Sequence, residues 1–206
     1  DLFMLFLEYE NLYDKFKISF PQFGKETFPP HERFKKYLKP SNVKSLLEKI
    51  PFDIDETDET NHGPAGFGKG KFNADLPFQP IHYRNTMISV VMGAFPFVDN
   101  CCHLHSSTFN PIHQGHPIIQ FGSYKSLERM KERGFKTFDK WWDESYDDIE
   151  DGWERFHSVL RLVKNLSKKT NEELLDMYID MKDVLQHNID LINEYDINLL
   201  REKIYD

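Results

Sequence analysis

The sequence predicts an α/β domain with a short, mainly parallel sheet, helices on both faces and two long helices at its C-terminal end. Residues 87–94, MISVVMGA, form a continuous apolar run that is typical of a strand buried on both faces. Residues 117–151 then read as an apolar strand, a Gly-Ser turn, an amphipathic helix, a second strand opened by Gly134, and an acidic aromatic segment. This β–turn–α–β order predicts a Rossmann-like domain.

The elements before this domain are shorter and more often interrupted. Residues 1–52 read as a helical connector, with a helix over residues 2–16 and a second helix that Ser41 can cap and Pro51 ends. Because the chain opens inside a helical pattern, we expect it to lack an upstream segment. Residues 53–80 are acidic and rich in Gly and Pro, which predicts a long loop. The Rossmann-like domain and its terminal helices then occupy residues 81–206.

Helical signals are clear in the last part of the chain. A helix over residues 123–133 has Gly134 as its natural stop. The first terminal helix is predicted from apolar residues on one face: Trp153, Phe156, Val159, Leu160 and Val163. The second is predicted to begin at Thr170, with Glu173 completing a capping box, and to continue at helical spacing to Tyr195.

Composition excludes several classes of protein. A net charge of −8 disfavours nonspecific nucleic-acid binding, which needs clustered Lys and Arg. No apolar run approaches the length of about 20 residues that spans a bilayer. The 18 Phe, 9 Tyr and 3 Trp among 206 residues indicate a packed core rather than disorder. The adjacent Cys101 and Cys102 suit a reducing compartment, so we predict a cytoplasmic protein.

Two motifs are weighed and set aside. Residues 63–70, GPAGFGKG, nearly spell a phosphate-binding loop, but Gly70 replaces the Ser or Thr that would hold Mg²⁺, and no strand and helix flank the motif. Residues 101–116 contain possible zinc ligands at Cys101, Cys102, His103, His105, His113 and His116. Their spacing fits no closed zinc site, so we predict no metal and no cofactor.

Hydrogen-bonding side chains follow the first strand. The loop over residues 99–115 joins the two predicted strands and carries Ser106, Ser107, Thr108 and Asn110. Ligands of open α/β sheets bind at the carboxyl ends of the strands, so these groups could contact one. Alternatively, the Ser and Thr residues merely begin and cap a helix at 106–108. Ser123 opens the next helix, whose backbone N–H groups suit a phosphate.

Four carboxylates lie just before the first terminal helix: Asp143, Glu144, Asp147 and Asp148. Paired acids can serve in glycoside hydrolysis. Capping of the following helix and compensation of its dipole are the simpler interpretation. No G-x-S-x-G motif indicates a hydrolase nucleophile.

Three segments carry a resemblance to a known family. HYRNTMISVV, STFNPIHQGHPIIQFGSYKSLERMKERGFKTF and DESYDDIED resemble the C-terminal half of glycosyltransferases encoded by phages and giant viruses. Those proteins look like distant relatives of fucosyltransferases and exostosin-like enzymes, which have two Rossmann-type domains. The resemblance covers about residues 80–190. It implies a nucleotide-sugar donor bound by this half, a glycan or protein acceptor, and a missing N-terminal domain as partner, in a protein of the host cytoplasm or the virion.

The charged residues of the family pattern are replaced here. The acidic residue that ends the family's strand falls at Gly93, and the Glu and two Lys of its loop fall at Ser106, Ser107 and Asn110. A charge-assisted contact is about twice as strong as a neutral one, so this exchange weakens donor binding. Two hypotheses follow: a glycosyltransferase in which Arg84 or a loop histidine replaces the lost Lys, and an inactive descendant that acts as a binding or structural module.

A donor site, in either case, is predicted from seven residues, with no catalytic residue assigned. They are Arg84, His105, Ser106, Ser107, Thr108, Asn110 and Ser123.

Overall fold

The computed structural model describes residues 2–16, 32–49, 83–93, 97, 104 and 106–205. The chain divides into two compact units, Asp1–Gln79 and Pro80–Asp206. The predicted loop over residues 53–80 and the phosphate-loop-like motif within it lie outside the described residues. Among the described residues, no helix combines the length and the apolar character needed to cross a membrane.

The first unit contains helices α1 (Leu2–Tyr9) and α2 (Pro40–Lys49) and the 3₁₀ helices η1 (Tyr13–Lys15) and η2 (Glu32–Leu38). The prediction of one helix over residues 2–16 is wrong, because α1 ends at Tyr9. Asn11 adopts a left-handed φ of 56°, and the Leu12 amide bonds the Leu7 carbonyl at 2.9 Å. Asn tolerates this backbone conformation, which ends helices. The buried Phe6 of α1 packs edge-on against Tyr37 of η2, with ring centroids 5.7 Å apart.

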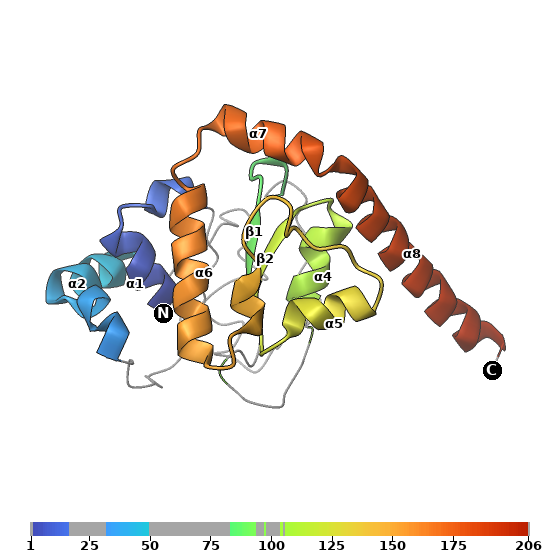
Figure 1. Ribbon diagram of the computed structural model, residues 1–206, viewed down its shortest axis with the longest axis horizontal. Coiled ribbons are helices and arrows are strands. Elements are labelled where there is room, and N and C mark those ends of the chain that lie inside the picture. Colours follow the sequence, from blue (N-terminus) through green and yellow to red (C-terminus); the bar gives the residue numbers. More distant parts are fainter. Residues whose placement is uncertain are drawn as a thin grey trace. The chain divides into compact units, whose positions relative to one another are not determined.

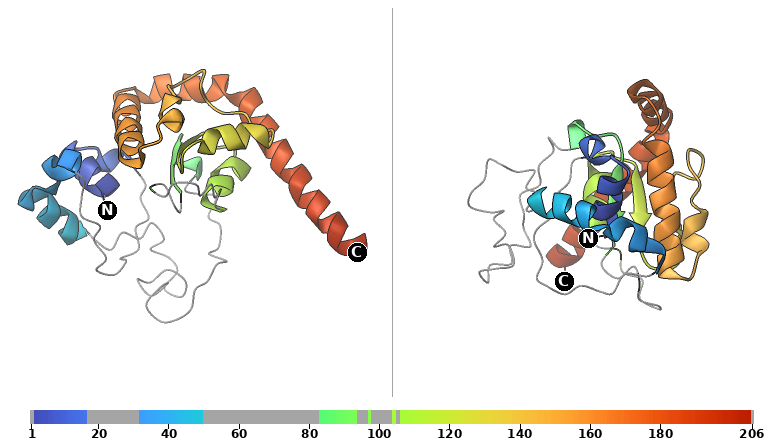
Figure 2. Two further views of the ribbon diagram at one scale, coloured as in Figure 1. Left: turned by 60° about the horizontal axis from the view of Figure 1, so that its bottom comes forward. Right: turned by 90° about the vertical axis from the view of Figure 1, so that its left-hand side faces the viewer.

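The second unit is built on a parallel pair of strands, β1 (Ser89–Met92) and β2 (Ile118–Phe121). Ser89 pairs with Ile118, and the register continues to Met92 and Phe121. Helix α4 (Ser106–His113) lies in the connection between them. The strands lie between α4 and α6 (Gly152–Leu166), as Figures 1 and 2 show. The α/β class with a short parallel sheet is therefore confirmed, and the Rossmann-like assignment stays a prediction.

Helix α6 covers β2 with the apolar face that the sequence predicts. Phe156, Val159, Leu160 and Val163 are all buried, and the ring of Phe156 lies 4.9 Å from that of Phe121. Asp151 caps the helix, since its side chain accepts a 2.7 Å hydrogen bond from the Glu154 amide.

Helix α5 (Ser126–Glu132) follows β2 and stops before Gly134, which has a φ of +88°. It begins three residues later than the sequence predicts. A 3₁₀ turn, η4 (Ser145–Asp148), comes next before α6.

The second strand expected after Gly134 does not form. The Lys136 amide donates to Asn188 Oδ1 and the Lys136 carbonyl accepts from Asn188 Nδ2, each at 2.8 Å. The Phe138 amide donates to Glu144 Oε1, also at 2.8 Å. Side chains therefore satisfy the backbone groups that a strand ladder would use.

The second terminal helix is divided in two, α7 (Asn171–Asp180) and α8 (Lys182–Tyr205). The predicted capping box at Thr170 and Glu173 is confirmed. The break falls at Met181, which is 1% exposed, next to Asp180, whose carboxylate accepts from Lys140 and Trp141 at 2.9 and 2.7 Å. The chain changes direction there, and α8 runs past α4 (Figure 1). Tertiary contacts at Asp180 and Met181 thus divide a segment whose apolar residues follow one continuous helical spacing.

Candidate functional site

The carboxyl ends of β1 and β2 meet at two glycines. The Gly93 amide donates to the Phe121 carbonyl at 2.8 Å. A Cβ on Gly93 would lie 3.2 Å from Gly122 Cα, and one on Gly122 would lie 2.6 Å from Ser126 Oγ. Only glycine allows this close approach. This edge is where the sequence predicts a ligand.

Thr108 does not present its hydroxyl to a ligand. It is fully buried in α4, and its Oγ1 donates to Gln120 Oε1 of β2 at 3.1 Å. The helix of which it is part begins at Ser106, so the alternative in which this segment starts a helix is the one observed. This hydrogen bond links α4 to the sheet.

The other predicted donor residues are spread through the unit. Arg84 and Asn110 are exposed, before β1 and on α4 respectively. Ser106 and Ser107 begin α4, but their side chains, like the whole of His105, lie outside the described residues. Ser123 is 6% exposed and directly follows Gly122. Ser123 therefore lies at the carboxyl edge of the sheet. Among the described residues, no contact links it to another of the predicted donor-binding residues.

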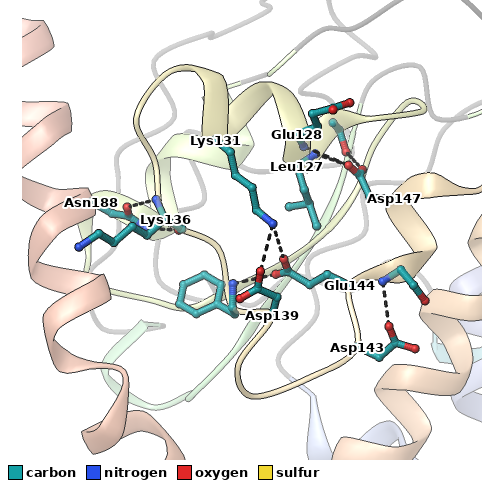
Figure 3. Close-up of polar contacts among 12 residues, drawn as sticks. Leu127, Glu128, Lys131, Lys136, Asp139, Asp143, Glu144, Asp147 and Asn188 are labelled. Atoms are coloured by element: carbon teal, nitrogen blue, oxygen red, sulfur yellow. Dashed lines mark hydrogen bonds and ion pairs between the residues drawn. The ribbon is translucent and has the colours of Figure 1, made fainter.

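The start of α5, which the sequence offers to a phosphate, already holds a carboxylate. Asp147 Oδ2 accepts hydrogen bonds from the amides of Leu127 and Glu128 at 2.9 and 3.1 Å. Its Oδ1 accepts from Ser126 Oγ at 3.0 Å. Asp147 is 5% exposed, and Figure 3 shows it against the first turn of α5. The acidic segment therefore caps the preceding helix through Asp147, whereas Asp151 caps the following one.

Glu144 is a second buried carboxylate in the same segment (Figure 3). Its side chain is 6% exposed, its Oε1 accepts from the Phe138 amide, and its Oε2 has no hydrogen-bond partner among the described residues. Lys131 Nζ lies 3.8 Å from Oε2 but 3.2 Å from Asp139 Oδ2. Burial raises the pKa of Glu144 above its usual value, against smaller opposing effects of Thr137, Phe138 and Lys131.

A pocket of about 210 Å³ opens between α5 and η4. Four carboxylates and two ammonium groups surround it. The lining residues are Lys125, Leu127, Glu128, Lys131, Glu144, Asp147 and Asp148.

Arg155 ties this acidic segment to the sheet. Its buried guanidinium donates from Nε to the Gly122 carbonyl at 3.0 Å and from Nη1 to the carbonyls of Ile149 and Glu150. A buried guanidinium needs several acceptors, and backbone carbonyls supply them here. Arg155 thereby fixes the end of β2 relative to the segment that carries Glu144 and Asp147.

His116, one of the four clustered histidines, has a structural role. Its Nε2 lies 2.9 and 2.7 Å from the carbonyls of Tyr83 and Thr86, and its Nδ1 lies 2.9 Å from Ser89 Oγ. Two carbonyl acceptors at Nε2 assign the proton to that nitrogen. Burial lowers the pKa of His116, against smaller opposing effects of its bonds to the Thr86 and Tyr83 carbonyls.

No metal site is found among the residues that the structure describes. Cys101, Cys102, His103 and His105 are outside them. The prediction that the clustered Cys and His residues hold no metal is therefore untested for most of them.

Sequence reasoning missed the residues that organise this region. Gln120 and Arg155 stand in an apolar strand and an amphipathic helix, and Asn188 stands on the apolar face of α8. One signal was available in the sequence: each of these polar residues stands where the pattern expects an apolar one. Buried polar groups need partners, so such a residue indicates a hydrogen bond in the interior. It could not reveal which partners.

Comparison of the chain with family models, curated proteins and solved structures finds no match.

Proposed function

We propose that this chain is a glycosyltransferase-like domain that acts as a binding or structural module and does not transfer sugars. The observation that supports this proposal is that the Asp147 carboxylate accepts hydrogen bonds from the backbone amides at the start of α5. In α/β domains such donors commonly hold the phosphate of a nucleotide. Here an internal carboxylate satisfies them, and the site has no need of an external anion.

Electrostatics also oppose a diphosphate at this position. Asp147 is flanked by Glu144 and Asp148. Two like charges 4 Å apart repel by about 4 kcal/mol at an effective dielectric constant of 20. A diphosphate near α5 would meet this repulsion, and displacing Asp147 would leave a buried carboxylate without its amides. The family's two loop lysines, which would offset the charge, correspond to Ser107 and Asn110.

An active glycosyltransferase is the second candidate, and one observation favours it. The side-chain amide nitrogen of Gln120 is buried and has no hydrogen-bond partner among the described residues. It lies 3.2 Å from a Cβ built on Gly122 and 3.6 Å from one built on Gly93. A free donor beside two glycines at the carboxyl edge of a sheet is suited to a polar ligand group. Arg84 cannot replace the lost lysine at this edge, because it precedes the amino end of β1.

Titration calorimetry with a panel of UDP-sugars and GDP-sugars separates the two candidates. For a module we expect no heat of binding with any donor. Saturable binding, together with release of the nucleoside diphosphate when acceptors are added, would establish the transferase and overturn the proposal.

A Ser107→Lys variant tests the reason for the loss. Restored donor binding in this variant, with none in the original chain, supports a site that lost its cation. Because Asn110 corresponds to the family's second loop lysine, the control for added charge alone is Gln186→Lys, at an exposed position of α8.

A further inference from the structure

Helix α7 carries five apolar residues and buries none of them fully. Leu174, Met177 and Tyr178 are half-buried. The Tyr178 hydroxyl donates to the Gly115 carbonyl at 2.9 Å, so this side of the helix faces the rest of its unit. Because Gly115 precedes the amino end of β2, α7 lies at the edge of the sheet opposite the predicted donor site (Figure 1).

Leu175 and Ile179 lie on a side of α7 that the rest of the unit leaves uncovered. They are 48% and 60% exposed. Residues four positions apart are neighbours on a helix surface, so the two aliphatic side chains form one patch. Contiguous exposed apolar side chains with a polar rim mark interaction surfaces, whereas single scattered ones need no explanation.

Glu172 and Asp176 form the rim of this patch. Each is exposed and precedes one of the two aliphatic residues by three positions, which makes it a neighbour on the helix surface. The two acids are also four positions apart, a spacing at which like charges destabilise a helix. Glu172 lies in the first turn, where it compensates the helix dipole, but Asp176 lies beyond that turn.

Neither carboxylate has an ion-pair partner in the part of the chain that the structure describes. A cation from outside would offset the repulsion between them. An interface that covers the two aliphatic side chains is therefore best completed by a partner of positive charge.

We propose that the Leu175–Ile179 face of α7 is a docking surface for a basic amphipathic helix of a partner protein. The apolar side chains of that helix cover Leu175 and Ile179, and its Lys or Arg residues lie beside Glu172 and Asp176. An apolar centre with a charged rim is the usual anatomy of such an interface. A second copy of α7 is a poorer occupant, because it would bring like charges together. This surface goes beyond the proposed function and is independent of nucleotide-sugar binding.

The test is an NMR titration of the full chain with three synthetic peptides. The first is an amphipathic helical peptide of leucine and lysine, the second has glutamate in place of lysine, and the third has serine in place of leucine. We expect only the first to shift the amides of α7 saturably. Added salt should weaken this binding, because it screens the exposed carboxylates.

Ile179→Ala should weaken binding of the leucine–lysine peptide by about tenfold, the effect of removing a central interface residue. Because Ile179 is 60% exposed, the variant should unfold at nearly the same urea concentration as the original chain. Met92→Ala is the matched control, since Met92 is an exposed apolar residue of β1, and it should change affinity less than about twofold.

The charged rim is tested by the double variant Glu172→Gln and Asp176→Asn, which should weaken binding about fivefold. The matched control is Asp190→Asn with Glu194→Gln. These exposed acids of α8 have the same spacing but lie beside no exposed aliphatic side chain, so their loss should change affinity less than about twofold.

Four results would overturn the proposal. They are the absence of a saturable shift at the α7 amides, equal binding of the glutamate or serine peptide, and equal losses of affinity in I179A and M92A. The fourth is self-association of the chain in sedimentation equilibrium that I179A abolishes, because it would assign this face to a second copy.

Discussion

Asp147 offers the sharpest test of how the acidic segment holds this domain together. Its carboxylate accepts from two backbone amides and one hydroxyl at 2.9 to 3.1 Å while 5% exposed. A hydrogen bond to a charged group contributes about 1.5–3 kcal/mol, and losing an acceptor leaves buried donors unsatisfied. Because the three bonds share one side chain, their contributions are not additive. We expect Asp147→Ala to lower the free energy of unfolding by about 3–5 kcal/mol.

Asp147→Asn should cost less, about 1–2 kcal/mol. Its carbonyl oxygen can still accept from the amides of Leu127 and Glu128, and Ser126 Oγ can accept from its amide nitrogen. Asp148→Asn is the control, because this exposed neighbour pairs only at the surface with Lys125 and should change stability by less than about 1 kcal/mol.

Urea denaturation followed by circular dichroism measures all three variants. A domain stability of about 5–15 kcal/mol makes the expected loss large. The reasoning is refuted if D147A stays within about 1 kcal/mol of the original chain, or if D148N costs as much as D147A.

Two further predictions concern Asn188 and Glu144. Asn188→Ala should lower the free energy of unfolding by about 1–3 kcal/mol, because it removes both hydrogen bonds to the Lys136 backbone. The control is Gln186→Ala, at an exposed position of the same helix, which should change the free energy of unfolding by less than about 0.5 kcal/mol. Equal losses for the two variants in urea denaturation would contradict the role given to Asn188. Glu144 has a raised pKa, so the native state holds its proton more tightly than the unfolded state, and its ionisation removes stability as the pH rises above 4.5. The unfolding free energy of E144Q minus that of the original chain should therefore fall as the pH is lowered from about 7 to 4.5, and a difference that is flat or rises would contradict the burial argument.

The proposed module rests on one structural property of residues 143–151. This segment folds back so that its acids serve α5 and the loop after it, rather than an external ligand. Glu144 holds the Phe138 amide and Asp147 holds the start of α5. Glu144 Oε2 is buried and ion-paired with Lys131 at 3.8 Å.

Short-range patterns in the sequence were enough to predict several elements. The capping box at Thr170, the stop at Gly134 and the buried face of α6 are all confirmed. So are the two parallel strands; the helix between them is the alternative that the sequence left open beside a ligand-binding loop. The capping box, the stop and the buried face depend on residues a few positions apart, where periodicity, capping and backbone preference act without the rest of the chain.

Tertiary structure decided what the same residues do. Asn188 bonds Lys136 across 52 positions and replaces a predicted strand, and Asp147 caps a helix some 20 positions before it instead of the one after it. Packing buries Met181 and divides a helix whose spacing is continuous. Each outcome depends on which distant groups meet in a dry interior, where a polar group must find a partner. The sequence alone determined which elements can form, and only the folded chain determined which of their polar groups remain available to a ligand.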